Sequence, residues 1–117
     1  MTPTWIEYKN KKILYVDYKL LSPEQIIDRI YAVAELLKTS EEGVLVLSDF
    51  TNVLIGIKIV EEVKVLGQEV FKNKTIKSAV LGVTGIKKML LVVYGKFSRD
   101  DVVSFDVYED ALEYLVS

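Results

Sequence analysis

Residues 43–52, GVLVLSDFTN, hold the stretch that decides the fold. Gly43 marks a boundary, and residues 44–47 form a continuous apolar run. An uninterrupted run of this kind is typical of a strand buried on both faces of a parallel sheet. Parallel strands are joined by crossover connections, so this run predicts helices on either side of it in the chain.

The segment before the run predicts a hairpin and then a helix. Two β-prone stretches, residues 5–8 and 12–18, are separated by a polar turn that contains an asparagine, as in an antiparallel hairpin. Ser22 is placed to cap the next helix, Pro23 suits its first position, and Gln25 completes a capping box. Apolar residues at helical spacing then predict one core-facing stripe of Ile26, Ile27, Ile30, Tyr31, Ala34 and Leu37.

After the run, helices and strands alternate along the chain. The predicted order is ββαβαβαβα, which defines an α/β fold in a single domain over residues 1–117. Its sheet is mostly parallel and five-stranded, with an N-terminal antiparallel hairpin, and it carries four helices. The next predicted element is a helix of about 16 residues that ends near Phe71 and has the apolar stripe Ile59, Val63, Leu66 and Val70. A strand at 76–81, a helix at 86–97 and a strand at 102–105 follow. The final helix is predicted to be capped by Asp106 and Glu109 and to carry the apolar residues Ala111, Leu112 and Leu115.

Composition narrows the range of functions. The 117 residues include neither cysteine nor histidine, which excludes thiol catalysis and removes the commonest general base and transition-metal ligand. We therefore expect a protein that is not an enzyme and that uses no metal and no cofactor. The first residues lack the apolar core of a signal peptide, and no apolar run is long enough to span a membrane, so a cytoplasmic protein is expected.

Charge is distributed unevenly behind a formal net charge of −2. Residues 70–99 carry seven basic residues and no acidic one, whereas residues 100–117 carry six acidic residues and no basic one. Either the two segments neutralise each other in the fold, or the basic segment presents a face to an anion or an acidic surface. Nucleic acid is not expected as a partner, because the whole chain is acidic and basic and aromatic residues are not interleaved.

Four short motifs lie in order along the chain: DFTN at residues 49–52, GVTGIKK at 82–88, KFS at 96–98, and a final segment from Phe105-Asp106 to EDALEYL at 109–115. Together with the order of elements, they resemble the STAS domain (sulfate transporter and anti-sigma factor antagonist), also called the SpoIIAA-like fold. The closer resemblance is to a bacterial branch of uncharacterised SpoIIAA-like proteins, from residue 12 to the last residue. The resemblance implies a regulatory or binding module rather than a catalyst.

One departure limits what the resemblance implies. Anti-sigma antagonists of this type carry a phosphorylated serine in an Asp-Ser-Ser-Gly sequence at the start of the second helix. The corresponding stretch here is Val53-Leu54-Ile55-Gly56, so the phosphoacceptor position is apolar. The kinase-driven partner switch is therefore not expected in this chain. Thr51, a few residues earlier, is a less favoured position for such a modification.

Two places are candidates for a small anionic or lipid ligand. The corner at residues 82–85 would expose backbone N–H groups at a helix start beside two lysines, or its glycines would only form a tight turn capped by Thr84. The second place is the edge where parallel strands end, to which Asp17 also belongs. The ligand-binding candidates are Thr84, Gly85, Lys87, Lys88, Asp49, Thr51 and Asn52.

The strands that end at Asp17 and Asp49 also resemble those of a response-regulator receiver. The resemblance stops at the chemistry, because Tyr18 stands where a second acidic residue is needed and no lysine follows the strand at 102–105. Phosphoryl transfer would then lack its metal-binding acids and its charge stabilisation. A degenerate receiver-like domain is the less favoured alternative.

The helix predicted at residues 86–97 is apolar on two sides. One stripe suits the core, and a second apolar group lies opposite it, flanked by lysines. That second group is either a set of scattered surface residues, a partner site, or a weak contact with a membrane surface. We expect a protein-interaction module that also self-associates as a homodimer. The interface candidates are Leu91, Val92, Gly95 and Lys96.

Overall fold

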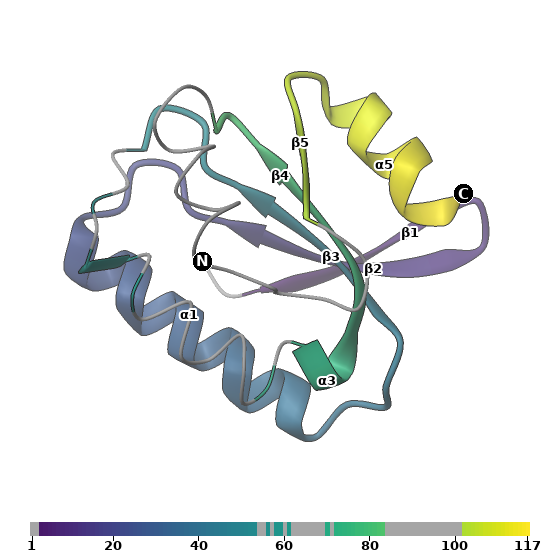
Figure 1. Ribbon diagram of the computed structural model, residues 1–117, viewed down its shortest axis with the longest axis horizontal. Helices are drawn as coiled ribbons and strands as arrows, with labels where there is room; N and C mark the ends of the chain where they lie inside the picture. The colour runs from purple at the N-terminus through teal and green to yellow at the C-terminus, as the bar shows by residue number, and fades with distance from the viewer. Residues whose placement is uncertain are drawn as a thin grey trace.

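The chain forms a five-stranded sheet whose strands lie side by side in sequence order (Figure 1). β1 and β2 pair antiparallel, and each later strand pairs parallel with the one before it. The predicted sheet with its opening hairpin is therefore confirmed. The elements are β1 (Thr4–Tyr8), β2 (Lys11–Asp17), α1 (Pro23–Lys38), β3 (Val44–Asp49), α3 (Lys72–Lys74), β4 (Thr75–Leu81), β5 (Val103–Phe105) and α5 (Tyr108–Val116). The computed structural model describes residues 3–53, 56, 58–59, 61, 70, 72–83 and 102–117.

A two-residue turn closes the hairpin between β1 and β2. Lys9 and Asn10 both adopt positive φ, at 49° and 66°. This conformation gives a turn whose twist matches that of the two flanking strands, and asparagine tolerates it well. The register that follows pairs Tyr8 with Lys11 and continues without a bulge to Thr4 and Tyr15.

The capping box at the start of α1 forms as predicted. The Ser22 hydroxyl accepts a hydrogen bond from the Gln25 amide, and the Gln25 side chain accepts one from the Ser22 amide. Pro23 occupies the first helical position, where a missing N–H costs nothing. Local sequence alone therefore fixes where this helix begins.

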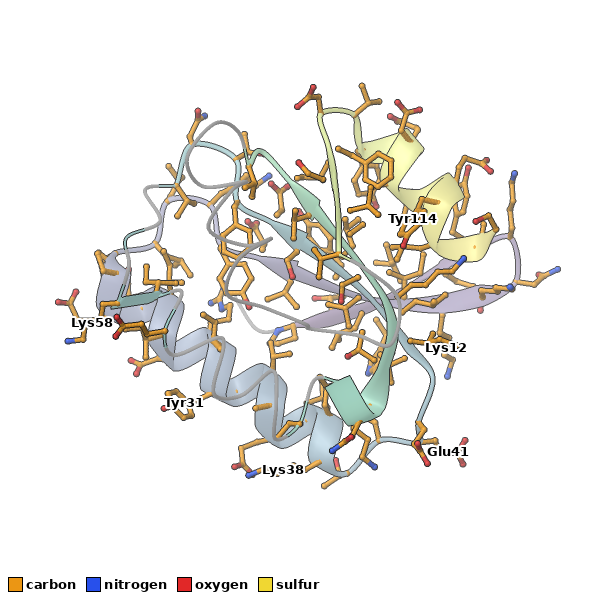
Figure 2. The ribbon with its side chains drawn as sticks, in the orientation of Figure 1. Lys12, Tyr31, Lys38, Glu41, Lys58 and Tyr114 are labelled. Carbon is orange, nitrogen blue, oxygen red and sulfur yellow. The ribbon has the colours of Figure 1, made fainter. Side chains whose placement is uncertain are left out.

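The buried stripe of α1 differs from the prediction at two residues. Val33 is buried, whereas Tyr31 is 46% exposed and its side chain points away from the sheet (Figure 2). The helical period explains both outcomes. Val33 lies only about 20° around the helix from Ile26, and Tyr31 lies about 140° from it. The buried residues of α1 are Ile26, Ile30, Val33, Ala34 and Leu37, with Ile27 partly buried against the same core.

The sheet carries apolar cores on both faces, and α1 and α5 lie on opposite sides of it (Figure 1). Neighbouring residues of each central strand face opposite cores because side chains alternate along a strand. In β3, Val46 packs on the α1 side and Leu47 on the α5 side. The apolar run at residues 44–47 is thus a strand covered on both faces.

The start of α5 differs from the predicted cap. The helix begins at Tyr108, and its N-cap is Val107, which makes no side-chain cap hydrogen bond. Asp106 therefore stands one residue too early to cap, and Glu109 lies within the first turn, where its charge favours the positive end of the helix. The predicted buried residues of this helix, Ala111, Leu112 and Leu115, are confirmed.

Two of the four predicted helices, α1 and α5, are described over their length. Most of the helix predicted to end near Phe71, including Val63 and Leu66, lies outside the described residues. Ile59 and Val70 of its predicted stripe are buried in the core on the α1 side. The helix predicted at residues 86–97 lies wholly outside the described residues.

Candidate functional site

The carboxyl ends of β2 and β3 are followed by two turns built in the same way. We call residues 17–21 and 49–53 the carboxyl edge. The turns themselves are residues 18–21 and 50–53. In each turn the amide of the fourth residue donates a hydrogen bond to the carbonyl of the first: Leu21 to Tyr18 at 3.4 Å and Val53 to Phe50 at 3.1 Å. The rings of Tyr18 and Phe50 stack with centroids 4.5 Å apart, which holds the two turns side by side.

Both turns require a left-handed residue at their third position. Asn52 has φ 59° and Leu20 has φ 63°. Asparagine is among the residues that adopt this conformation readily, whereas for leucine it costs about 1–2 kcal/mol. Leu20 is also 94% exposed, so burial does not offset the cost. The turn after β2 therefore holds an apolar side chain in water at the expense of backbone strain.

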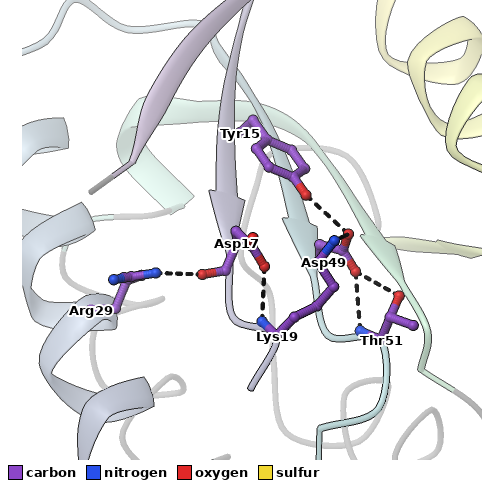
Figure 3. Close-up of polar contacts among 6 residues, drawn as sticks. All are labelled: Tyr15, Asp17, Lys19, Arg29, Asp49 and Thr51. Atoms are coloured by element: carbon purple, nitrogen blue, oxygen red, sulfur yellow. Dashed lines mark hydrogen bonds and ion pairs between the residues drawn. The ribbon is translucent and has the colours of Figure 1, made fainter. Parts of the chain in front are cut away.

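Asp49 is the buried charge of the carboxyl edge, with 6% of its surface exposed (Figure 3). One carboxylate oxygen, Oδ1, accepts hydrogen bonds from the Thr51 hydroxyl at 2.6 Å and the Thr51 amide at 3.1 Å. The other, Oδ2, accepts one from the Tyr15 hydroxyl at 3.0 Å and lies 3.6 Å from Lys19 Nζ. Both oxygens are thus engaged by donors of the chain itself.

The surroundings of Asp49 keep it ionised. Burial on its own would raise the pKa of this carboxyl. The hydrogen bonds from Thr51 and Tyr15 and the charge of Lys19 outweigh burial, so the pKa lies below its usual 3.8. The same contact raises the pKa of the Tyr15 hydroxyl, for which burial is the larger cause and the bond to Asp49 the second.

Asp17 and Asp49 are register partners on adjacent strands. The Asp17 carboxylate accepts the Lys19 amide at 2.9 Å, and its backbone carbonyl accepts a bond from Arg29 Nη1 at 2.6 Å (Figure 3). These contacts tie the turn after β2 to α1. Among the described residues, no group of three or more acidic side chains is placed to hold a metal ion.

Gly82, just after β4, packs directly against the turn after β3. Its φ is 77°, and a Cβ added to it would lie 2.5 Å from the Thr51 Cα atom. A side chain at this position would therefore displace the backbone that positions the Asp49 contacts. The GVTG motif predicted a turn glycine here, and the close approach to Thr51 is the additional reason for glycine.

The predicted site is brought together only in part. Asp17, Asp49, Thr51 and Asn52 lie together at the carboxyl edge, with Thr51 and Asn52 exposed. The other predicted residues lie outside the described part of the chain: Thr84, Gly85, Lys87 and Lys88 of the ligand site, and Leu91, Val92, Gly95 and Lys96 of the interface.

Sequence reasoning missed Tyr15, Lys19 and Leu20. A signal for Tyr15 was available, because it stands two residues before Asp17 and so lies on the same face of β2. The contact with Asp49 additionally requires the register that pairs Asp17 with Asp49. The sequence offers no comparable signal for Leu20, whose importance comes from its backbone angle and exposure.

Comparison with known proteins establishes the fold class. The chain is similar over 97% of its length to a solved structure from Shewanella loihica PV-4, an uncharacterized protein of the DUF3478 family with a SpoIIAA-like fold. The match covers 92% of that chain, with a TM-score of 0.67 and 14% sequence identity. The predicted SpoIIAA-like α/β fold is therefore confirmed, and at this identity the likeness concerns the fold alone. No protein-family model and no curated protein matches the chain. Within the described residues, no helix is long and apolar enough to cross a membrane.

Proposed function

We propose that this protein is a non-enzymatic protein-interaction module that docks a partner through the turn after β2. The observation that carries the proposal is Leu20, which is 94% exposed and held at φ 63°. An apolar side chain in this state gains nothing from its own fold and would gain from burial against another protein. The partner expected is a protein with an apolar pocket that accepts one leucine.

The contacts around Leu20 support this role. Lys19 on one side is held by its amide to Asp17 and by its ammonium near Asp49. Leu21 on the other side packs against the core on the α1 side. The backbone at Leu20 is therefore held in place by its two neighbours, which lowers the conformational entropy lost when a partner binds the Leu20 side chain.

The carboxyl edge also favours binding over catalysis. A general base or a phosphoacceptor needs a carboxylate oxygen free to meet substrate. Both oxygens of Asp49 already accept internal hydrogen bonds, and the Thr51 hydroxyl spends its proton on Asp49. This arrangement is that of a carboxylate that shapes two turns.

The test is the substitution Leu20→Asn, compared with Tyr31→Ala as a matched loss of another exposed side chain. Asparagine accepts the left-handed conformation, so we expect the free energy of unfolding to rise by about 1 kcal/mol. Proteins captured from the source cells by the wild-type chain should be lost with Leu20→Asn and retained with Tyr31→Ala. If all three baits retain the same proteins, docking through Leu20 is wrong.

A small anionic or lipid ligand is the alternative function. Native mass spectrometry of the purified protein distinguishes it, because a retained small molecule adds a discrete mass to the 13.3 kDa chain. Such an adduct would favour the ligand function, whereas a bare chain with a protein partner sensitive to Leu20→Asn would favour docking.

A further inference from the structure

β1 is an edge strand, and among the described strands none pairs with its outer side. It stands at one end of the sheet and pairs with β2 alone. None of its residues is buried, and Trp5 is 43% exposed. Its sequence, TWIEY, has no proline or lysine, and its register with β2 has no bulge. Proline, lysine and bulges are among the devices by which sheet edges avoid pairing with another chain, and the charged residue of β1 is Glu7.

The hairpin geometry identifies which backbone groups face outward. In a two-residue hairpin the residues beside the turn, Tyr8 and Lys11, form a hydrogen-bonded pair, and such pairs alternate along the ladder. Ile6 therefore also points its backbone groups toward β2. The N–H and C=O groups of Trp5 and Glu7 point to the open side, and within the described residues no hydrogen bond to another element engages them.

We infer that β1 pairs antiparallel with β1 of a second copy of this chain, with the two-fold axis at Ile6. In this register Trp5 of each copy faces Glu7 of the other, and each such pair exchanges both of its outward backbone hydrogen bonds. Ile6 meets its own copy across the axis, where facing side chains approach closely. The two sheets would become one continuous sheet across the pair.

Other antiparallel registers of the same strand are poorer. An axis at Glu7 would set two like charges directly opposite each other. An axis at Trp5 would set Glu7 against Pro3, which has no N–H to donate. If the two-fold axis lay between two residues, the residues of β1 whose N–H and C=O groups point to the open side would lie opposite residues whose groups point toward β2, and no hydrogen bonds would form between them. The strand is therefore complementary to itself in one register, which is why a second copy is the expected occupant.

This inference concerns a surface separate from Leu20 and does not depend on the proposed docking function. It also assigns self-association to β1, whereas the sequence had suggested Leu91 and Val92, which lie outside the described residues. The variant Leu20→Asn should accordingly leave the mass in solution unchanged, so the two proposals can fail separately.

Solution mass provides the first test. Static light scattering of the full chain should give twice 13.3 kDa at high concentration and fall toward one chain on dilution. Glu7→Pro removes an outward N–H and spares the inward bonds of Ile6 and Tyr8. We expect it to raise the dissociation constant about tenfold or more. Trp5→Lys places a charge on the edge and should also raise the dissociation constant. It serves as the second variant if Glu7→Pro fails to fold. Tyr31→Lys is the control and should not change the mass.

Cysteine crosslinking tests the register itself. The chain contains no cysteine, so Ile6→Cys introduces one thiol at the axis. Facing Cα atoms of a non-hydrogen-bonded pair lie about 4.5 Å apart, which suits a disulfide. In the control Thr4→Cys, the more exposed position, the two thiols would be roughly 14 Å apart. Under mild oxidation Ile6→Cys should crosslink and Thr4→Cys should not. A wild-type monomer at high concentration, or equal crosslinking of both variants, would overturn the inference.

Discussion

Asp49 shows how one residue organises the end of two strands. Its carboxylate is bound by Thr51, Tyr15 and Lys19, which come from two different turns and from β2. A buried carboxylate with these donors stabilises the folded state only while it is ionised. The DFTN motif can then be explained as a structural unit: an acceptor, a buried ring, a donor and a left-handed asparagine.

The pH dependence of stability should reveal this role. Because the pKa of Asp49 is lowered on folding, its contribution is present above about pH 4 and is lost as the pH falls through the lowered value. We expect Asp49→Asn to reduce the free energy of unfolding at pH 7 by about 1–3 kcal/mol. The difference from wild type should shrink below about pH 4. Urea unfolding at a series of pH values measures this.

Asp17→Asn is the matched control for that experiment. Asp17 is the register partner of Asp49, and its carboxylate accepts one amide at the end of β2. Its substitution should cost less than that of Asp49 at pH 7. Equal costs for the two variants, or a constant deficit of Asp49→Asn across the acid range, would contradict the assigned role.

At the scale of elements, the turn after β3 depends on Gly82, which packs directly against Thr51. Gly43 and Gly82 both have positive φ, at 88° and 77°, but a Cβ on Gly43 would meet nothing within 4 Å. Alanine at Gly43 should therefore cost only the backbone strain, about 1–2 kcal/mol. Alanine at Gly82 should cost clearly more, since the added Cβ would lie 2.5 Å from the Thr51 Cα atom.

Thermal unfolding of the two alanine variants, followed by far-ultraviolet circular dichroism, measures this difference. The Gly82 variant should also weaken the Asp49 contacts, so combining it with Asp49→Asn should cost less than the sum of the two single changes. Equal melting temperatures for Gly43→Ala and Gly82→Ala would contradict this prediction, because the backbone at Thr51 would then move away from the new Cβ without loss of stability.

The elements that could be predicted are those whose signals are local. The capping box at Ser22, the β-turn asparagine and the apolar run of β3 each depend on a few adjacent residues, and each is confirmed. Predictions that depended on helix phase or on an exact start were weaker. Tyr31 was placed in the core, and Asp106 was placed at a cap that Val107 occupies.

The sequence predicts which residues lie at the candidate site, but not which side chains contact one another there. The carboxyl ends of parallel strands lie at one edge of a sheet. The fold class alone therefore predicts that four residues lie together there: Asp17, Asp49, Thr51 and Asn52. The partners Tyr15 and Lys19 depend on the register between β2 and β3, and the strain at Leu20 depends on one backbone angle. Neither is encoded in spacing along the chain.

At the scale of the whole molecule, one sheet is shared by two cores. Ile13 and Leu14 are adjacent in β2 and fully buried in opposite cores, so neither face can open without disturbing the strand. Across the molecule, the β1–β2 turn is also tied to α5, because Tyr8 and Lys9 both bind Glu113. This arrangement joins the N-terminal hairpin, the sheet and the last helix.

We therefore expect the chain to unfold in one cooperative step. Leu37→Ala in the α1-side core and Leu115→Ala in the α5-side core should each cost about 2–5 kcal/mol, since both residues are almost completely buried. In each variant the emission of Trp5 and the far-ultraviolet circular dichroism should change at the same urea concentration. Glu41→Ala, at an exposed position between α1 and β3, should leave that midpoint nearly unchanged. If Leu115→Ala released α5 at low urea while the Trp5 signal stayed native, the two cores would be independent, and the sheet would not couple them.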